Sequence, residues 1–398
     1  MKALSKWTAF VLVVLAVLGI AHEPLFWKRY FLVLAHGTGA LPLSFYEPRE
    51  RVAGGNQPPA PRVTPISESL DLKALEAAAD YAGAHQSRAL IVSRHGYIVF
   101  ERYWQGTHFD TLIDSQSLAR IIVALVTGSA VSERRIGWPD EPIGLILTEW
   151  RNDPRGAITV RNLLQLSSGL MPPEPAAGPW SEAAGEAYGS DIIAQYLRRP
   201  LAGDPGKKWL NQSADPELLA WVIERATGQR YARYVSQALW QRLGAGDAWL
   251  WLDRPGGAAH VDRGFLVRQG DWIRVAELLL KNGNYQGDEV LDPRWVPQML
   301  QPAKSNTDYG AYLRLGAHVA TGIPAYAASD LFLIEGGGNR LWLIPSLQIA
   351  ILRTGDAPAG GAAGWDDARI PNLIVRGARD FVPGAARPGD LSSIVPHH

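Results

Sequence analysis

The sequence predicts an α+β fold in which strands from both ends of the chain form one antiparallel sheet, with a mostly helical subdomain between them. Two short strand-like runs, 89–93 and 97–103, occur early, and the strand pattern returns after about residue 312. The stretch from about 138 to 310 carries mainly helical and loop patterns. Strands at both ends with helices between them indicate a single sheet flanked by helices.

The N-terminal residues 1–27 have the pattern of a signal peptide or of a retained membrane anchor. Lys2 and Lys6 precede an apolar run, 7–21, that ends in a small-x-small sequence. A second apolar patch, 30–35, would help an uncleaved anchor lie near the bilayer, so both alternatives stay open. The positive-inside rule keeps the lysines cytoplasmic. We therefore expect the chain in the cell envelope, at the periplasmic face of the inner membrane or in the periplasm.

Residues 28–68 are expected to form an extended lead-in, because the stretch from 36 onward is rich in Gly and Pro and lacks periodicity. A domain over 69–398 follows, with its sheet part in 69–116 and 312–380 and its helical part in 117–311. Asp71 is the candidate N-cap of its first helix, since apolar residues recur behind it at helical spacing. The turn 94–96, which contains a Gly, predicts a β-hairpin from the two runs that it joins.

A buried helix is predicted to begin at Ser117 and to end near Gly128 or shortly after. Its apolar stripe consists of Leu118, Ile121, Ile122, Leu125 and Val126. A later helix is marked by Asp215 as N-cap, Pro216 at its first position and Gly228 just past its end. Strands are predicted over 331–334, 341–344 and 349–353, and a final helix over 366–378.

The composition excludes several classes of site. Lys plus Arg and Asp plus Glu are balanced at 39 each in the 398 residues, so no net field favours nucleic acid as a partner. The chain has no Cys, which rules out disulfides, thiolate zinc sites and a cysteine nucleophile. Its nine His residues show no ligand spacing. We therefore expect neither a metal nor another cofactor.

Five segments, in order, resemble one known family: 89–128, 158–173 ("ITVRNLLQLSSGLMPP"), 206–235, 270–291 and 336–355. They resemble the β-lactamase-related serine hydrolases, which include class C β-lactamases, DD-peptidases, esterases and 6-aminohexanoate-dimer hydrolases. The resemblance spans roughly residues 68–380. It implies a β-lactamase/transpeptidase-like fold and a catalytic Ser-x-x-Lys motif at the start of a helix.

Ser117 and Arg120 occupy the two positions of that motif. The hydroxyl needs a base to attack a carbonyl, and a helix places the fourth residue one turn along on the same face. The helix N-terminus offers backbone N–H groups to a developing oxyanion. Arg is a poor replacement for Lys because a guanidinium stays charged at any physiological pH. Arg120 can therefore hold Ser117 or stabilise negative charge, but it cannot act as the base.

The family's second motif supplies a Tyr that protonates the leaving group, and Asn211 stands in the matching stretch. An amide does not titrate and can only donate and accept hydrogen bonds. No Tyr lies between 197 and 230, so a shift of register would not restore one. Both proton-handling positions thus depart from the family pattern.

The third motif lies on a sheet edge, and the glycine run Gly336, Gly337 and Gly338 aligns with it. Glycines let a ligand approach the backbone closely, although a plain turn is the alternative. The tripeptide 353–355 mimics Lys-Thr-Gly but falls one strand too late. It is interpreted as a decoy.

A few residues outside these motifs are weaker candidates. Tyr188 is proposed as a substrate contact or stand-in acid, with an exposed loop position as the alternative. His260 and Asp262 are expected on a solvated loop near the cleft. Glu335, beside the glycines, is the carboxylate that could replace the missing base.

Taken together, the residues favour an envelope binding or regulatory protein whose cleft keeps its nucleophile but has impaired or silent chemistry. Its ligand would be a small amide, ester or peptidoglycan-like molecule. The alternative is an active serine hydrolase, an esterase or amidase, that forms an acyl-enzyme on Ser117 through a non-standard proton relay. The missing acid and base each remove help that is typically worth about a hundred- to ten-thousand-fold.

Overall fold

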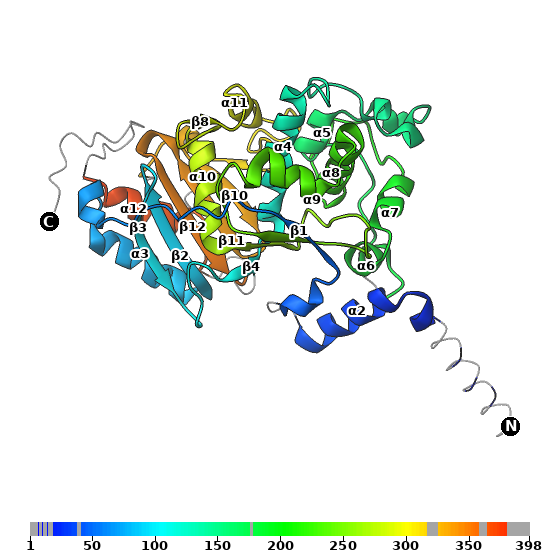
Figure 1. The fold of residues 1–398 in the computed structure, drawn as a ribbon, viewed down its shortest axis with the longest axis horizontal. Helices are drawn as coiled ribbons and strands as arrows, with labels where there is room; N and C mark the ends of the chain where they lie inside the picture. The colour runs from blue at the N-terminus through cyan, green and yellow to red at the C-terminus, as the bar shows by residue number, and fades with distance from the viewer. Residues whose placement is uncertain are drawn as a thin grey trace.

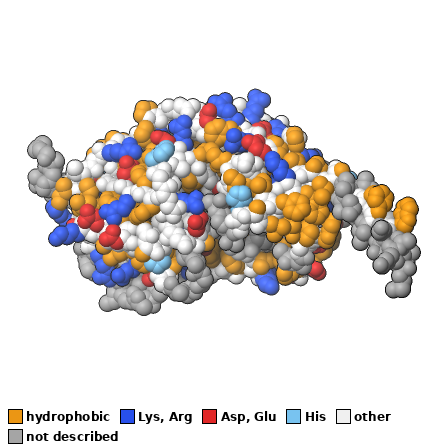
Figure 2. All heavy atoms as spheres, turned by 90° about the horizontal axis from the view of Figure 1, so that it is seen from below, with side chains coloured by type: hydrophobic (Ala, Val, Ile, Leu, Met, Phe, Trp, Pro, Cys, Tyr) orange, Lys and Arg blue, Asp and Glu red, His pale blue; other side chains and the backbone are white. Residues whose placement is uncertain are grey.

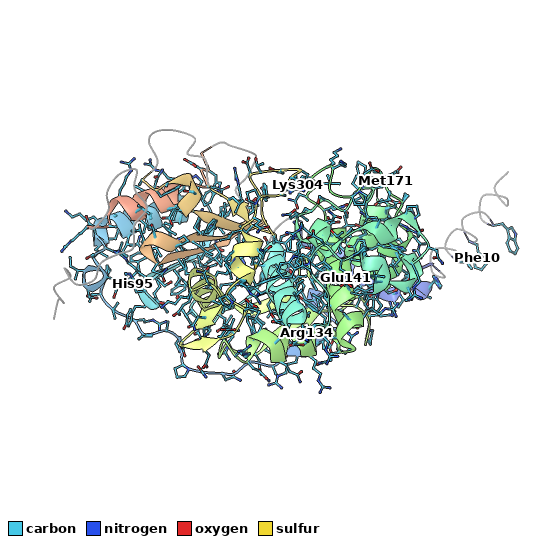
Figure 3. All side chains as sticks on the ribbon, turned by 90° about the horizontal axis from the view of Figure 1, so that it is seen from above. Phe10, His95, Arg134, Glu141, Met171 and Lys304 are labelled. Carbon is cyan, nitrogen blue, oxygen red and sulfur yellow. The ribbon has the colours of Figure 1, made fainter. Side chains whose placement is uncertain are left out.

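A computed structural model describes Trp7, Phe10, Val14 and residues 19–37, 41–175, 178–316, 325–357 and 364–379. The sheet part and the helical part lie side by side (Figure 1). Helix α4 (Arg120–Ser132) lies between them, as the view from above shows (Figure 3). Ser117 directly precedes this central helix, so the nucleophile position falls at the junction of the two parts.

The main sheet has six strands in the order β3-β2-β12-β11-β10-β9, each antiparallel to its neighbours. This confirms the predicted sheet built from both chain ends. The hairpin turn adopts positive φ at His95 (51°) and Gly96 (87°), as a tight two-residue turn requires. The strands are β2 Ser87–Arg94, β3 Tyr97–Tyr103, β9 Arg314–Leu315, β10 Phe332–Gly336, β11 Asn339–Ile344 and β12 Ile349–Gly355.

Helices bury both faces of this sheet, which explains why its strands read as nearly continuous apolar runs. On one face, α3 (Leu72–Ala84) and α12 (Arg369–Arg376) pack against Leu90 and Val92. On the other face, α4 and α10 (Trp272–Leu280) pack in the core that contains Ala89 and Ile91. Asp71 caps α3 by accepting the N–H of Lys73, as predicted.

The helical part contains the predicted helix as α8 (Ala214–Thr227), which ends at Gly228 in the left-handed conformation. The predicted N-cap was wrong: Ser213 occupies the cap position, while Asp215 lies inside the first turn and is fully buried. The remaining helices are α5 Val160–Leu164, α6 Glu182–Tyr188, α7 Ile192–Arg198, α9 Tyr231–Val235 and α11 Trp295–Met299. Short helical turns are η1 Leu43–Phe45, η2 Pro65–Glu68, η3 Gln116–Ala119, η4 Ile143–Leu145, η5 Thr148–Trp150, η6 Pro154–Ala157, η7 Ser236–Trp240, η8 Gln269–Asp271, η9 Ala328–Asp330 and η10 Pro345–Leu347.

A second sheet corrects the expectation of a helical region from 117 to 311. Its four strands run in the order β1-β5-β6-β4. They are β1 Arg49–Val52, β4 Leu112–Asp114, β5 Ala248–Trp251 and β6 Phe265–Arg268. A small hairpin, β7 Asn284–Tyr285 with β8 Asp288–Glu289, completes the strands of the described residues. The second sheet matters for function because β4 ends just before Ser117.

The expectation of an extended lead-in over 28–68 was wrong for much of that range. Residues Pro24–His36 form helix α2, and β1 pairs with β5. The reason is a buried polar contact that periodicity does not reveal. Arg29 is 1% exposed and its guanidinium donates to the carbonyls of Tyr188, Gly189, Asp253, Glu47 and Leu252.

The predicted signal or anchor segment 1–27 lies largely outside the described residues. Within the described part of the chain, no helix has both the length and the apolar character needed to cross a membrane. Helix α2 begins at Pro24 and continues past residue 27, so the structure places the end of that segment inside a helix.

Candidate active site

Ser117 lies in the turn η3, where β4 passes into α4, and its side chain is partly exposed. The buried carboxylate of Asp114 holds this turn in place. It accepts the N–H of Gln116 (3.0 Å) and of Gly264 (2.8 Å) and the hydroxyl of Tyr46 (2.9 Å). Burial raises the pKa of Asp114, which the same hydrogen bonds oppose. The nucleophile position is therefore set by a rigid polar junction.

The predicted glycine run lies directly against this turn. A Cβ at Gly336 would stand 2.4 Å from the backbone N of Leu118 and 2.6 Å from that of Ser117. The Gln116 side chain accepts the N–H of Gly338 (3.1 Å), and Asn339 donates to the carbonyl of Asp114 (3.1 Å). Only a glycine lets the end of β10 approach the helix N-terminus this closely, where backbone N–H groups can stabilise an oxyanion.

Two side chains hold the guanidinium of Arg120. Its Nε donates to a carboxylate oxygen of Asp262, and its Nη1 donates to Oδ1 of Asn211 (2.5 Å). The other Asp262 oxygen accepts the hydroxyl of Ser213 (2.5 Å). The structure thus brings together Ser117, Arg120 and Asn211, as the resemblance implied, and adds Asp262 as the counter-ion.

The electrostatics of this cluster keep Arg120 and Asp262 ionised. Burial alone would lower the pKa of Arg120, but the adjacent Asp262 carboxylate raises it above its ordinary value. Burial would raise the pKa of Asp262, and the Arg120 guanidinium instead holds it well below its usual range. Neither group can take a proton from Ser117 near neutral pH, because one is a guanidinium and the other a stabilised carboxylate.

Further buried carboxylates surround this ion pair. Burial raises the pKa of Asp215 to about 7 and that of Glu217 to about 8. Asp215 accepts the hydroxyl of Ser168 (2.6 Å), and Glu217 accepts the backbone N–H of Val261 (3.0 Å). Their hydrogen bonds tie α8 to its neighbours, so we assign them a structural role.

The expectation of a solvated loop at His260 and Asp262 was wrong. His260 is 1% exposed and stacks on Trp251, with the ring centroids 3.8 Å apart. Burial lowers the pKa of His260 well below its ordinary value. Asp262 is 5% exposed and pairs with Arg120. The sequence offered no signal for this pairing, since the two residues are 142 positions apart.

A cavity of about 280 Å³ opens beside Ser117, Arg120 and Asn211. Tyr309, Tyr312 and Glu335 also line it, and the Tyr309 hydroxyl donates to Glu335 (2.8 Å). No spacing in the sequence marks either tyrosine, because both lie in the irregular segment before β9 and outside residues 197–230. Burial raises the pKa of each above that of a free phenol.

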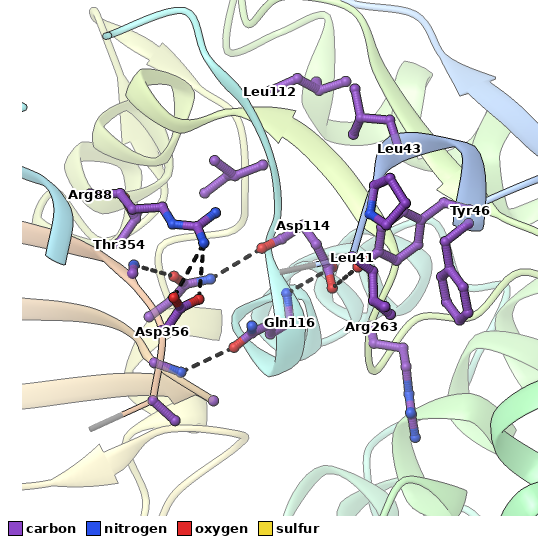
Figure 4. Close-up of a pocket in the computed structure, with 18 of the residues that line it drawn as sticks. Leu41, Leu43, Tyr46, Arg88, Leu112, Asp114, Gln116, Arg263, Thr354 and Asp356 are labelled. Carbon is purple, nitrogen blue, oxygen red and sulfur yellow. Dashed lines mark hydrogen bonds and ion pairs between the residues drawn. The ribbon is translucent and has the colours of Figure 1, made fainter. Parts of the chain in front are cut away.

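A larger cavity, of about 860 Å³, opens on another side of Ser117 (Figure 4). Tyr188 lines it, at the end of α6, and packs edge-on against Phe26 and Tyr30 of α2. Tyr188 is therefore a wall residue shared with α2, and burial raises its pKa.

The tripeptide 353–355, interpreted as a decoy, lies on β12, an inner strand of the sheet. Arg353 is fully buried and donates to Ser87 Oγ (2.7 Å) and to the carbonyl of Gly338. It stabilises the turn that carries the glycine run. Thr354 and Gly355, in contrast, line the larger cavity. Within the described residues, no cluster of His, Asp or Glu could hold a metal ion.

The family model for β-lactamase matches residues 72–353. The chain is 25% identical to a 6-aminohexanoate-dimer hydrolase of Paenarthrobacter ureafaciens over 296 residues, 70% of this chain and 74% of that protein. It is 33% identical to Esterase EstB of Burkholderia gladioli over 226 residues, 47% of this chain and 55% of the esterase. The crystal structure of a family VIII carboxylesterase superposes with a TM-score of 0.61 at 15% identity, covering 80% of this chain and 98% of the esterase. The family model matches more than half of the chain, and the sheet order and the Ser117 turn agree with it. The chain therefore belongs to the β-lactamase family, which has a serine hydrolase fold.

Proposed function

We propose that this protein binds a small amide, ester or peptidoglycan-like ligand in the Ser117 cleft with strongly impaired or no turnover. The observation that carries the proposal is the ion pair of Arg120 with Asp262 at the position where the family has its base. A guanidinium that is paired and hydrogen-bonded in this way cannot accept the Ser117 proton. The remaining cleft keeps the features that bind a carbonyl group.

The two residues that transfer protons in the family are both replaced in this cleft. In the described residues, the Ser117 hydroxyl has no hydrogen-bond partner, and the nearest family position for an acid is Asn211, which does not titrate. Loss of positioned acid and base costs about a hundred- to ten-thousand-fold each. Backbone N–H groups at the helix start would still hold a ligand carbonyl. These features support a binding or regulatory role.

The alternative is an active esterase or amidase that acylates Ser117 through an unusual relay. The observation that favours it is the Tyr309–Glu335 pair, which lines the same cavity as Ser117. The names of the relatives, a 6-aminohexanoate-dimer hydrolase and an esterase, point in the same direction. In this alternative, Glu335 would take the proton and Tyr309 would return it to the leaving group.

The two functions differ in whether labelling and ester turnover depend on Ser117. The native chain and Ser117→Ala are incubated with a fluorescent penicillin and, separately, with p-nitrophenyl esters. We expect no serine-dependent labelling and equal, near-background ester turnover. Labelling or turnover that Ser117→Ala abolishes would reject the silent cleft, and loss of that activity in Glu335→Gln would then support the relay.

We also propose that the N-terminal segment keeps the protein at the periplasmic face of the inner membrane. Support comes from apolar side chains that the N-terminal segment exposes, including Trp7 (70%), Phe10 (61%) and Leu34 (64%). In spheroplasts, we expect the full chain to be degraded by added protease and otherwise to sediment with membranes. A soluble chain that resists the protease would contradict this placement.

A further inference from the structure

Helix α2 carries two apolar stripes, and the rest of the domain covers only one of them. In the covered stripe, Phe26 is buried against Tyr188 of α6, with the ring centroids 6.1 Å apart. Trp27, Phe31 and Leu34 recur at helical spacing in the other stripe, where Phe31 (51%) and Leu34 (64%) are exposed. A helix that is apolar on two faces needs a second apolar surrounding for the face that its own domain leaves open.

The open stripe of α2 continues onto a segment that is distant in the sequence. Trp180, just before α6, is 82% exposed, and its ring centroid lies 5.3 Å from that of Trp27. Trp27 in turn stacks on Phe31, with the ring centroids 5.6 Å apart. Hydrophobic side chains gather at this end of the molecule (Figure 2). The surface formed by Trp27, Phe31, Leu34 and Trp180 is called the α2 face below.

Exposed apolar side chains are concentrated near the start of the chain. Thirteen large hydrophobic side chains are exposed within the described residues, and seven of them lie between Trp7 and Leu43. Single exposed hydrophobic side chains are normal on a protein surface, whereas a contiguous patch indicates contact with another apolar surface. The α2 face is a contiguous patch because its three aromatic rings contact one another.

Two features of α2 fit a lipid bilayer as the partner of this face. Trp27 donates its indole N–H to the carbonyl of Gly19 (3.2 Å), so α2 is tied to the end of the apolar run 7–21 that we place at the membrane. Lys28, which is exposed on α2, adds a positive charge. Tryptophan is enriched where proteins meet lipid headgroups, and basic side chains there are attracted to anionic lipids.

From these contacts we propose that the folded domain docks on the membrane surface through the α2 face, with its aromatic rings among the lipid headgroups. This inference rests on the proposed membrane placement and goes beyond it. The N-terminal run alone would leave the domain free to tumble on a tether, whereas docking brings α2 and the segment before α6 into contact with lipid.

Arg29 fixes the rest of the domain to the docked helix. Its buried guanidinium donates to five backbone carbonyls that all lie outside α2. Val33 and Gly37, at the end of the same helix, line the larger cavity beside Ser117. Docking of α2 therefore also sets the position of the cleft relative to the membrane, and Arg29 is its positioning residue.

The absence of Cys from the chain allows single spin labels to test the docking. Phe31→Cys and Trp180→Cys each place one label on the α2 face and leave its other members unchanged. Tyr97→Cys is the control, on the hairpin that carries His95, at the opposite end of the molecule from Phe10 (Figure 3). The labelled full-length chain is reconstituted into vesicles of phosphatidylethanolamine and phosphatidylglycerol. Collisions of each label are measured with molecular oxygen, which concentrates in lipid, and with a polar nickel chelate, which stays in water.

Docking predicts a higher ratio of oxygen to nickel collisions on the α2 face. We expect the ratio at positions 31 and 180 to exceed that at position 97 at least about threefold. Equal ratios at all three positions, in chains that sediment with the vesicles, would overturn the docking and keep the membrane placement. A chain that stays in the supernatant would reject both. Low collision rates with both reagents at positions 31 and 180 would indicate a protein contact, such as a second copy, and would also overturn docking on lipid.

A second set of variants tests the role of Arg29. In Arg29→Gln, the label at position 31 should keep its ratio because α2 follows the N-terminal run, whereas the ratio at position 180 should fall to that at position 97. Arg29→Lys keeps the charge but has fewer donors for the five carbonyls, so it should lower the ratio at position 180 by a smaller factor. Arg294→Gln, at a side chain that is 80% exposed, is the control and should change neither ratio. An unchanged ratio at position 180 in both Arg29 variants would contradict the positioning role.

Discussion

The two sides of Ser117 differ in what they retain. On the hairpin side, glycines and backbone N–H groups meet the nucleophile turn as in a site that binds a carbonyl, and Gly336 leaves no room for a side chain. On the helix side, Arg120 and Asp262 form a buried ion pair where the family transfers a proton. One side is still shaped for a ligand, whereas the other is held by a structural contact.

The difference supports the proposal that the position of the family's base now contributes to stability while the residues around it keep their arrangement. Ionised Arg120 lies among buried carboxylates and stabilises α4 against α8 and the loop that carries Asp262. The hairpin side needs no such replacement, because backbone groups do not depend on the identity of residue 120.

Removal of Asp262 should have the largest effect. Asp262→Ala leaves the Arg120 guanidinium buried without a counter-ion, and breaking a buried pair typically costs about 3–5 kcal/mol. Urea unfolding measures the change in the free energy of unfolding. Asp140→Ala is the control, since Asp140 pairs with Arg161 (2.7 Å) at an exposed position and should cost less than about 1 kcal/mol. Similar losses in both variants would contradict the role of the buried pair.

Restoring chemistry should require Asp262 as well as the two motif positions. In Arg120→Lys with Asn211→Tyr, the Asp262 carboxylate would keep the new lysine charged, so ester turnover should stay near background. Adding Asp262→Asn should lower the lysine pKa and raise p-nitrophenyl acetate turnover at least about a hundredfold over the double variant. Equal turnover in the double and triple variants would show that Asp262 does not restrain the base.

Closing the hairpin side should be less costly but still measurable. Gly336→Ala forces a Cβ to within 2.4–2.6 Å of backbone nitrogens, so β10 must shift, at a cost of about 1–3 kcal/mol. Gly203→Ala is the control, because a Cβ there meets nothing within 4 Å. Chemical denaturation compares the two. A Gly336→Ala chain as stable as Gly203→Ala would rule out the close approach.

The smallest expected effect, measured per pH unit, is on the pH dependence of the free energy of unfolding. Burial, and then the charge of Asp262, raise the pKa of Glu217 from 4.5 to about 8. Between these values the folded chain keeps a proton that the unfolded chain has released, so stability falls as pH rises from 4.5 to about 8. Glu217→Gln should reduce that slope by about 1 kcal/mol per pH unit. The exposed Glu76→Gln serves as control, and an unchanged slope in Glu217→Gln would contradict the assignment.

The sequence predicted the sheet well because strands and caps depend on local patterns. The β2–β3 hairpin and the start of α3 at Asp71 follow from residues within a few positions of each other. The resemblance also identified Ser117, Arg120 and Asn211, and the structure brings them together. Local patterns could not show the role of Arg29, because four of the five carbonyls that hold its side chain lie more than 150 positions away.

The missed residues of the site share this property. Asp262, Tyr309 and Tyr312 lie in irregular segments, so no spacing marked them, and only the tertiary fold brings them to Ser117. Asp262 in particular was expected in solvent. An Arg in place of Lys is itself a signal for a nearby carboxylate, but it does not say which of the 39 acidic residues supplies it.

The central claim is that Ser117 has lost its activating base, and its reaction rate with a fluorophosphonate measures this most directly. Fluorophosphonates modify activated serines, and their fluoride leaves without being protonated by an acid of the protein. The account predicts that the native chain and Ser117→Ala are labelled at the same background rate at neutral pH. Rapid labelling of the native chain that Ser117→Ala abolishes would contradict it.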